Sequence, residues 1–289
     1  MTATLTRTNE FTIRKLDAPL GAEIIGFDFG VRLDDERFAL ISNAMREHRF
    51  LCFRDADVTP AQQIEMSRRF GDLPLHPQIK YRHPAHPEIF LISNLDANGR
   101  PTGKNPDPTA AQWHTDGSWR SPRASVTMLY GDVVPQTGGD TLIANTALAY
   151  ERLSPRKKEE ADRLIAVHDL QWSVSTTNPD YALTPAQEKA RVAPPQEQPL
   201  ALRHPDTGVR AIYLGAHAAS IVGLPWDEGR EVIDEFNALA TDPECVYAHR
   251  WKSHDLVLWD NRCTLHKSTP YDYATERRIA RRTSMYETA

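Results

Sequence analysis

The sequence is poor in cysteine, and its cysteines show no pattern. Only three occur in 289 residues, at Cys52, Cys245 and Cys263, and none belongs to a Cys-x-x-Cys pair. An odd number of scattered cysteines gives no sign of a disulfide framework or of paired-thiol metal binding. Each lies in an apolar stretch, so we expect small buried thiols and, as the default compartment, the reducing cytoplasm.

Long hydrophobic runs and a large excess of one charge are also missing. No apolar segment approaches the length of a membrane-spanning helix, and Met1–Thr4 opens no secretory signal. The formal net charge is -5 and the pI is near 6.1, which argues against a nucleic-acid groove or an anionic membrane surface. We therefore expect a small-molecule partner, with neither nucleic acid nor membrane as the main target.

The sequence also lacks a glycine-rich phosphate loop after a strand, internal repeats and heptads, which argues against nucleotide-binding and solenoid folds. The hydrophobic patterns predict many short strands with helices at the flanks. A two-sheet antiparallel jelly roll covered by helices is the natural architecture for this pattern. The expected elements are strands at 50–53, 126–130, 141–144, 246–251, 256–259 and 279–286, a hairpin at 202–214, and helices at 34–45, 59–71, 146–152, 155–166 and 232–240.

Two stretches, 72–111 and 172–198, are predicted to be lid or insertion loops. The first is broken by prolines and holds only one strand-like segment, Ile89–Ile92; the second is polar, proline-rich and weakly periodic. A loop of this length inside a compact domain is more often a lid or binding loop than a simple connection. The first loop leads directly into the segment with the most informative chemistry.

That segment contains His114 and Asp116, two residues apart. Side chains alternate along an extended chain, so these two point to the same side. A third candidate, His266, follows an Asp260-Asn261 turn. Two histidines and one carboxylate, with three positions left open, are the ligand set of non-haem Fe(II) oxygenases. The same residues also suit zinc in a jelly-roll hydrolase or isomerase, and unmetallated histidines would fit a cupin-like binding protein.

Four arginines lie on the last expected strand, at positions 277, 278, 281 and 282. Alternation places Arg278 and Arg282 on one face and Arg277 and Arg281 on the other. A solvated basic edge strand is one explanation. Because the strand follows His266, an inward arginine could instead bind an anionic ligand at the metal, since its planar fork suits a carboxylate.

Together these motifs resemble the Fe(II)- and 2-oxoglutarate-dependent dioxygenases of the taurine and 2,4-dichlorophenoxyacetate type. The resemblance covers residues 16–285. It implies a double-stranded β-helix (jelly-roll, cupin-like) core in a single dioxygenase domain, residues 1–289, with assembly into homo-oligomers. It also implies Fe(II), 2-oxoglutarate and O2. The motifs that carry it are His114-x-Asp116, Gly138-Gly139-Asp140-Thr141, Trp259-Asp260-Asn261-Arg262 with His266, and Arg277-Arg278-x-x-Arg281-Arg282.

The resemblance implies a role for each of these residues. His114, Asp116 and His266 resemble the iron ligands. Thr141 and Arg278 resemble the residues that hold the distal carboxylate of 2-oxoglutarate, with Arg277 as the alternative because the spacing from His266 differs by one. Arg282 resembles the arginine directed at the substrate acid or the open iron face, and is the catalytic candidate. The substrate-binding candidates are His76, Asn94, His217 and Arg282.

Two signals point to different substrates. The segment Tyr213–Ala218 resembles phenoxyacetate enzymes, whereas His76-Pro77 resembles the taurine enzyme, which has a tyrosine where this chain has Ile79. We therefore expect hydroxylation of a small organic acid of the aryloxyacetate type, with ether cleavage and release of succinate and CO2. A sulfonate or alkylsulfate dioxygenase is the alternative with the same iron chemistry.

Overall fold

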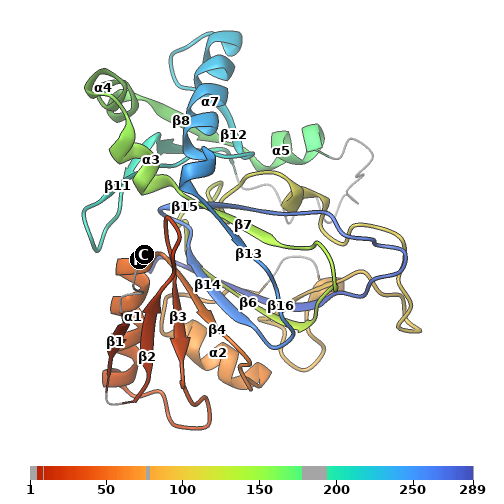
Figure 1. Ribbon diagram of the computed structural model, residues 1–289. Coiled ribbons are helices and arrows are strands. Elements are labelled where there is room, and N and C mark those ends of the chain that lie inside the picture. The colour runs from red at the N-terminus through yellow and green to blue at the C-terminus, as the bar shows by residue number, and fades with distance from the viewer. Residues whose placement is uncertain (1–4, 9, 76–78, 178–193, 289) are drawn as a thin grey trace.

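The computed structural model describes residues 5–8, 10–75, 79–177 and 194–288. The protein is mainly β with flanking helices, as predicted (Figure 1). In the described part of the chain, no helix is both long and apolar enough to cross a membrane. The helices are α1 (Asp35–His48), α2 (Pro60–Arg68), α3 (Thr146–Arg152), α4 (Pro155–Arg163), α5 (Leu170–Thr177) and α7 (Trp226–Ala240), with short 3-10 turns η1 (Ile79–Tyr81), η2 (Pro108–Ala111) and η3 (Pro243–Cys245).

The strands are short, as their alternating patterns predict. They are β1 (Leu5–Arg7), β2 (Thr12–Lys15), β3 (Ala22–Ile25), β4 (Phe50–Phe53), β5 (Phe90–Ser93), β6 (Ala124–Val133), β7 (Thr141–Asn145), β8 (Ile165–His168), β9 (Gln196–Pro199), β10 (Ala201–Arg203), β11 (Arg210–Ile212), β12 (Ala218–Ile221), β13 (Val246–His249), β14 (Leu256–Asp260), β15 (Thr264–Ser268) and β16 (Ile279–Tyr286).

The large sheet has the order β1-β2-β3-β4-β14-β6-β16-β5. Its central strand β14 is buried on both faces, and its side chains alternate between two cores. Leu256 and Leu258 pack into the core beneath α1 and α2, whereas Val257 and Trp259 face the other way. This double burial explains why 256–259 reads as an uninterrupted apolar run.

A smaller sheet, β13-β7-β15, packs on that second face. Ile143 of β7 lies in the same core as Val257 and Trp259, so the two sheets meet through this cluster. β7 pairs with β15 on one side, with His266 opposite Ile143 and Ser268 opposite Thr141. This register puts a histidine and a threonine from neighbouring strands close together.

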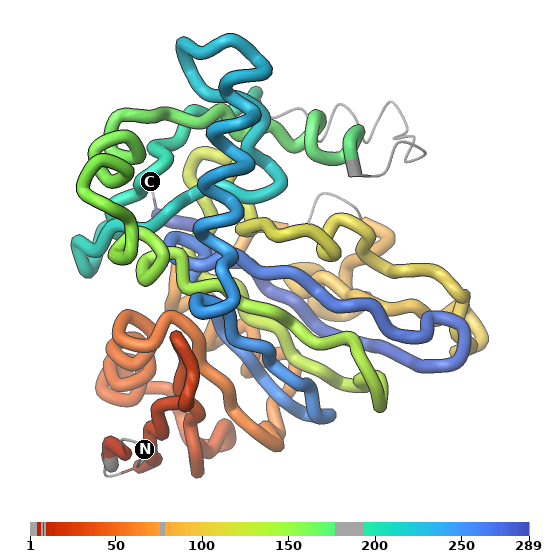
Figure 2. The backbone as a smooth tube through the Cα atoms, turned by 45° about the horizontal axis from the view of Figure 1, so that its top comes forward, coloured from red at the N-terminus to blue at the C-terminus, as the bar shows by residue number. Residues whose placement is uncertain are grey.

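A third part of the molecule covers one end of the sheets. It contains α3, α4 and α7, the hairpin β10–β11 and the sheet β12-β8-β9, and it lies opposite the N-terminal strands and α1 (Figures 1 and 2). Ile233 and Phe236 of α7 are fully buried in its core. This amphipathic face agrees with the helix predicted behind Pro225.

Several local predictions are confirmed in detail. α2 begins with a capping box in which Thr59 and Gln62 bond each other's backbone, and α4 begins with Ser154 as N-cap and Pro155 behind it. The hairpin around residues 206–208 also forms.

Other local predictions are wrong. Residues 165–168 form β8 instead of extending the helix, 170–177 form α5 where a loop was expected, and β12 and β15 were not expected as strands. Each of these strands is defined by pairing with distant residues, which local patterns do not reveal. Loop 72–111 contains η1, β5 and η2, while the middle of the second expected loop, 178–193, lies outside the described residues.

Candidate active site

A backbone bridge brings the two candidate metal-binding histidines together. His114 and His266 pair in antiparallel fashion, with N–H to carbonyl distances of 3.0 Å and 2.8 Å in the two directions. Directly opposed residues in such a pair point to the same side, and the two rings lie 4.1 Å apart between centroids. Two segments far apart in the chain therefore present two imidazoles side by side.

Asp116 completes a compact group of three metal-type donors. Its carboxylate oxygens lie 3.8 Å from His114 Nε2 and 3.9 Å from His266 Nε2, and the three side chains are buried. All three donor atoms lie within 4.8 Å of one another. Two imidazoles and one carboxylate gathered on one side of a centre are the donor set of a non-haem Fe(II) site. The residues present thus fit an Fe(II) ion.

The surroundings of Asp116 keep its carboxylate ionised and fixed. Burial by itself would raise the pKa of this carboxylate, but the charge of Arg282 and a hydrogen bond from Thr127 act against burial, and the pKa is lowered. The Thr127 hydroxyl donates to Asp116 Oδ2 at 2.7 Å, and the Asn261 side-chain amide donates to Thr127 at 2.9 Å. No sequence pattern singled out Thr127, whereas Asn261 was indicated as a turn residue and as part of the Trp259–Arg262 motif.

The surroundings of both histidine rings favour metal binding. His114 Nδ1 lies 2.8 Å from the carbonyl of Gln112, and because a carbonyl only accepts, Nδ1 carries the proton and leaves Nε2 free to ligate. His266 packs against the indole of Trp259, with ring centroids 4.5 Å apart. Burial holds the pKa of His266 well below its usual value. Neutral imidazole is the form that binds a metal.

A small cavity of about 50 Å³ adjoins the histidines, and Arg278 and Thr141 line it. Arg278 is buried, and its guanidinium donates to the carbonyl of Gly139 at 2.7 Å. Within the described residues, no carboxylate lies close enough to Arg278 to form an ion pair. The Thr141 hydroxyl accepts from the indole N–H of Trp251 at 3.0 Å, which leaves its own proton to donate. A buried cation and a hydroxyl beside metal donors suit a small carboxylate ligand.

The structure separates the two neighbouring arginines. Arg277 is exposed, whereas Arg278 is buried and faces the small cavity. Asn94 lies behind Arg278: its side-chain oxygen accepts from the Arg278 N–H at 2.8 Å, and its amide donates to the carbonyl of Glu276 at 2.9 Å. Asn94 therefore fixes the backbone that carries Arg278. Among the described residues, it lines neither this small cavity nor the larger one beside it.

A larger cavity of about 590 Å³ opens from the metal donors. Arg282 of β16 lies at its inner end, 3.7 Å from Asp116 and over the ring of Phe90 at 4.7 Å. His217 lines the cavity as well, and burial lowers its pKa to about 3, so it is a neutral group there. His76 lies outside the described residues. The wall of the cavity is rich in apolar and aromatic side chains, including Leu75, Tyr81, Trp119, Leu170, Val174 and Tyr286.

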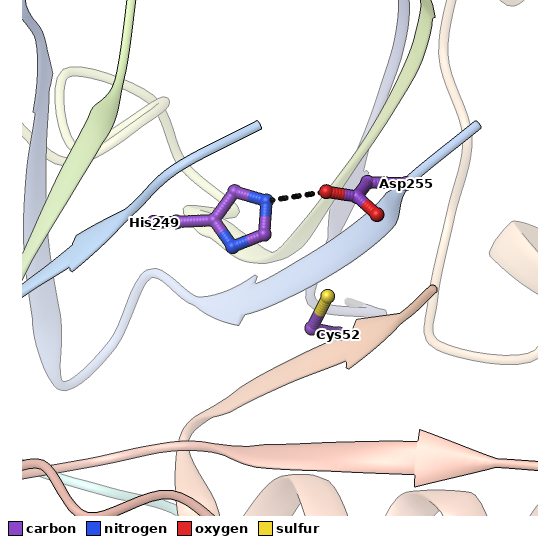
Figure 3. Close-up of side chains that lie close together, drawn as sticks. All are labelled: Cys52, His249 and Asp255. Carbon is purple, nitrogen blue, oxygen red and sulfur yellow. Dashed lines mark ion pairs between the residues drawn. The ribbon is translucent and has the colours of Figure 1, made fainter. Parts of the chain in front are cut away.

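Among the described residues, two other buried groups contain metal-type donors. Cys52, His249 and Asp255 lie close together at the edge of the inter-sheet core, with His249 Nε2 facing Asp255 at 3.3 Å (Figure 3). Asp255 already pairs with Arg54, and burial raises the pKa of the Cys52 thiol to about 12, so this thiol is protonated. A cation beside the carboxylate and a neutral thiol both disfavour metal binding there.

The other group, formed by His204, Asp260 and Cys263, is held by hydrogen bonds. Asp260 accepts from both His204, at 3.0 Å, and Arg262, at 2.7 Å and 2.9 Å. These contacts occupy the carboxylate, which identifies it as part of a structural network at the turn before β15. Of the three groups, only the one around Asp116 adjoins both cavities.

Comparisons with known proteins agree with this geometry. The sequence matches the family described as "Taurine catabolism dioxygenase TauD, TfdA family" over residues 12–283. It is 34% identical over 254 residues to the alpha-ketoglutarate-dependent 2,4-dichlorophenoxyacetate dioxygenase of Cupriavidus pinatubonensis, covering 85% of this chain and 87% of that one. It is 30% identical over 285 residues to an alkylsulfatase of Acinetobacter baylyi, covering 96% and 86%.

A solved structure shows the same likeness in three dimensions. AAD-2, crystallised in complex with Mn(II) and N-oxalylglycine, superposes with a TM-score of 0.83 at 31% sequence identity. The match covers 96% of this chain and 98% of that one. Both sequence and fold are therefore shared over almost the whole length.

Proposed function

Because the chain belongs to the taurine catabolism dioxygenase TauD, TfdA family, we propose that it hydroxylates a small aryloxyacetate-type acid beside the ether oxygen. It is a 2-oxoglutarate-dependent non-haem iron dioxygenase, which uses Fe(II), 2-oxoglutarate and O2. Hydroxylation at this carbon gives a hemiacetal, which collapses to a phenol and an oxoacid. The observation that carries the proposal is the placement of Arg282, at the junction of the metal donors and a cavity whose wall includes several apolar and aromatic side chains.

His114, Asp116 and His266 are assigned the role of binding Fe(II). Bound Fe(II) supplies oxygen activation coupled to oxidative decarboxylation of 2-oxoglutarate to succinate and CO2. The three residues occupy one side of the centre, so the co-substrates must approach from the side of the two cavities. Thr127 and Asn261 keep the carboxylate of Asp116 oriented, which preserves the geometry during turnover.

Arg278 and Thr141 are assigned to the distal carboxylate of 2-oxoglutarate. The guanidinium is buried and needs an anion, and the Thr141 hydroxyl can donate a second hydrogen bond to it. The exposed Arg277 has no such access. A bidentate arginine in a closed cavity fixes both the position and the orientation of the co-substrate.

Arg282 is assigned to the substrate acid. Its guanidinium lies over Phe90 and beside Asp116, so an acid bound to it has its α-carbon near the metal. His217 is neutral and can share a hydrogen bond without adding charge. The apolar wall excludes water and accommodates an aryl ring.

An alkylsulfate is the second candidate substrate, because the alkylsulfatase relative shares 30% identity over nearly the whole chain. A sulfate ester also presents an anion to Arg282, followed by an apolar tail.

We propose a double-stranded β-helix core built from the two facing sheets, in one domain over residues 1–289. The uninterrupted family match over residues 12–283 supports the single domain. The lid role of residues 72–111 and 172–198, assembly into a homo-oligomer and a cytoplasmic location stay predictions.

The test is succinate formation from 2-oxoglutarate with phenoxyacetate, taurine and a medium-chain alkylsulfate. We expect kcat/KM for phenoxyacetate to exceed that for taurine at least tenfold, about 1.4 kcal/mol of discrimination. His266→Ala should lose activity on every substrate. A higher kcat/KM for the alkylsulfate than for phenoxyacetate would favour the second candidate substrate. A higher kcat/KM for taurine would contradict the proposed aryloxyacetate activity.

A further inference from the structure

A tight turn directly follows the metal ligand Asp116. The N–H of Arg120 donates to the carbonyl of Gly117 at 3.1 Å, which closes the turn. Ser118 within the turn is buried, and its hydroxyl lies 2.8 Å from Nδ1 of His168. The carbonyl of Ser118 accepts from the side chain of Gln198 at 3.0 Å. These contacts on strands β8 and β9 fix the backbone of Arg120 relative to the metal centre.

The side chain of Arg120 is held between two aromatic rings. Its guanidinium carbon lies 4.9 Å from the ring centre of Trp119 and 5.2 Å from that of Tyr286. Tyr286 in turn packs on Gly117, where an added Cβ would lie only 2.9 Å from the tyrosine ring. Gly117, Trp119, Arg120 and Tyr286 all line the large cavity. Contact with two rings and a hydrogen bond to the Tyr286 hydroxyl orient this guanidinium, and its remaining N–H groups can donate to a ligand.

The charge of Arg120 is not balanced by its surroundings. In the described ranges, no carboxylate lies within ion-pair distance of it. Of the described carboxylates that line the cavity, Glu88 pairs with Arg68 at 2.8 Å and Asp116 lies 3.7 Å from Arg282, while Asp107 accepts from the Thr109 hydroxyl at 2.6 Å. Burial raises the pKa of the Tyr286 phenol, so that group stays neutral as well. Besides Arg282, the described wall of the cavity therefore carries two cationic side chains, the exposed Lys104 and the ring-packed Arg120.

Arg282 and Arg120 lie at different positions along the cavity. Arg282, Ser284 and Tyr286 alternate along β16 and all reach the cavity wall. Four residues of strand span about 13 Å, so the Tyr286 end is well removed from Arg282. A substrate hydroxylated next to its carboxylate must place that acid at Arg282, near the metal. Its aryl ring then extends along the wall towards Tyr286 and Arg120.

We propose that Arg120 is a specificity-determining residue that binds an anionic group on the far end of the substrate's aryl ring. This inference rests on the proposed aryloxyacetate activity. The substrate class it selects is an aryloxyacetate with a second acid on the ring, such as 4-carboxyphenoxyacetate. The aliphatic acid binds Arg282 and the aromatic acid binds Arg120, and the two charges also fix which end faces the metal.

The experiment compares kcat/KM for 4-carboxyphenoxyacetate and for 4-isopropylphenoxyacetate, which is similar in size but has no second charge. We expect the wild-type enzyme to favour the diacid at least tenfold. In Arg120→Gln this ratio should fall at least tenfold, mainly through KM for the diacid, and Arg120→Lys should recover part of it. Added salt should lower the wild-type ratio, because screening weakens a partly exposed ion pair.

Arg69→Gln is the matched control. Arg69 also stacks on an aromatic ring, Phe38, at 4.5 Å, and it does not line the large cavity. The Arg69→Gln variant should keep the wild-type ratio of kcat/KM for the two compounds. An Arg120→Gln ratio equal to that of the wild type would overturn the inference.

A binding measurement separates this inference from the proposed function. If the wild-type enzyme oxidises neither compound, the proposed function fails. Titration of 4-carboxyphenoxyacetate into protein loaded with Mn(II) and N-oxalylglycine then still tests Arg120. A tenfold weaker Kd in Arg120→Gln supports the second anion subsite, and an unchanged Kd rejects it.

Discussion

At the scale of single residues, the metal site depends on a hydroxyl that does not itself face the metal. Thr127 donates to one oxygen of Asp116 and accepts from Asn261, so it connects the carboxylate to the turn that precedes His266. The side-chain oxygen of Asn261 accepts in turn from the indole of Trp259 at 3.0 Å. A carboxylate held in this way keeps one orientation, and such outer contacts strongly affect metal affinity.

Thr127→Val should therefore weaken metal binding by about 10- to 100-fold without unfolding the protein. Valine has nearly the same shape and occupies the same buried position on β6, but it cannot donate to Asp116. The measurement is a Co(II) or Mn(II) titration, with circular dichroism to verify the fold.

Thr146→Val provides the comparison for this experiment. Thr146 is equally buried, but among the described residues its hydroxyl has no hydrogen-bond partner. The Thr146→Val variant should keep wild-type metal affinity. Equal losses in both variants would mean that Thr127 acts through packing alone.

At the scale of elements, alternation along β16 points its neighbouring arginines to opposite faces of the sheet. Arg281 points away from the active site, pairs with Asp132 at 3.1 Å, donates to the carbonyl of Val58 at 2.8 Å and lies over the ring of Tyr130. Arg282, one residue later, points into the large cavity. The pleat of one strand thus assigns opposite tasks to two adjacent, chemically identical side chains.

The turn between β6 and β7 connects a backbone requirement to co-substrate binding. Gly138 and Gly139 have φ angles of +73° and +67°, in the region that favours glycine. The carbonyl of Gly139 holds the guanidinium of Arg278, and a Cβ on Gly139 would lie 3.1 Å from it. This explains why a Gly-Gly pair precedes Thr141.

Gly139→Ala should raise KM for 2-oxoglutarate several-fold, because the new methyl group displaces Arg278. Backbone strain at positive φ should also lower the free energy of unfolding by about 1 kcal/mol. Steady-state kinetics at varied 2-oxoglutarate and urea denaturation measure the two effects.

Gly99→Ala separates strain from displacement. Gly99 has a similar φ of +73°, but nothing lies within 4 Å of its would-be Cβ. We expect the same modest loss of stability with an unchanged KM for 2-oxoglutarate. A raised KM in this variant would contradict the role assigned to the Gly139 contact.

At the scale of the whole molecule, the active site joins the two sheets. His266 comes from the small sheet, Arg282 from the large sheet, and Asp116 from the segment that precedes β6. Ligands that bind these three residues stabilise the folded state, because only there are the residues close together.

Mn(II) with N-oxalylglycine, each at 100 times its Kd, should therefore stabilise the protein. One ligand at that ratio contributes about 2.7 kcal/mol, which corresponds to several degrees in Tm. Differential scanning fluorimetry measures the shift, and a chelator should reverse the part that depends on metal.

His266→Ala tests whether this shift arises at the assigned site. The variant should show no Mn(II)-dependent increase in Tm, because one of the three donors is gone. A full shift in this variant would place the metal elsewhere in the protein.

The sequence by itself determined the residue types of the site and most of the elements around it. His114 and Asp116 share a side because any extended chain alternates, and helices α2 and α4 begin where capping residues require. The order of the motifs was enough to indicate the family, because chemistry restricts which side chains can bind iron and a carboxylate.

Only the tertiary structure decided which of these residues meet. The pairing of β15 with β7 and the bridge between His114 and His266 depend on contacts between segments far apart in the chain. Asn94 was predicted to bind substrate, yet it bonds the backbone of Arg278. The contacts of Arg120 with Trp119 and Tyr286 likewise follow from the fold and not from a sequence pattern. Local patterns encode the direction of a side chain relative to its own strand, whereas its neighbours are set by packing of distant segments.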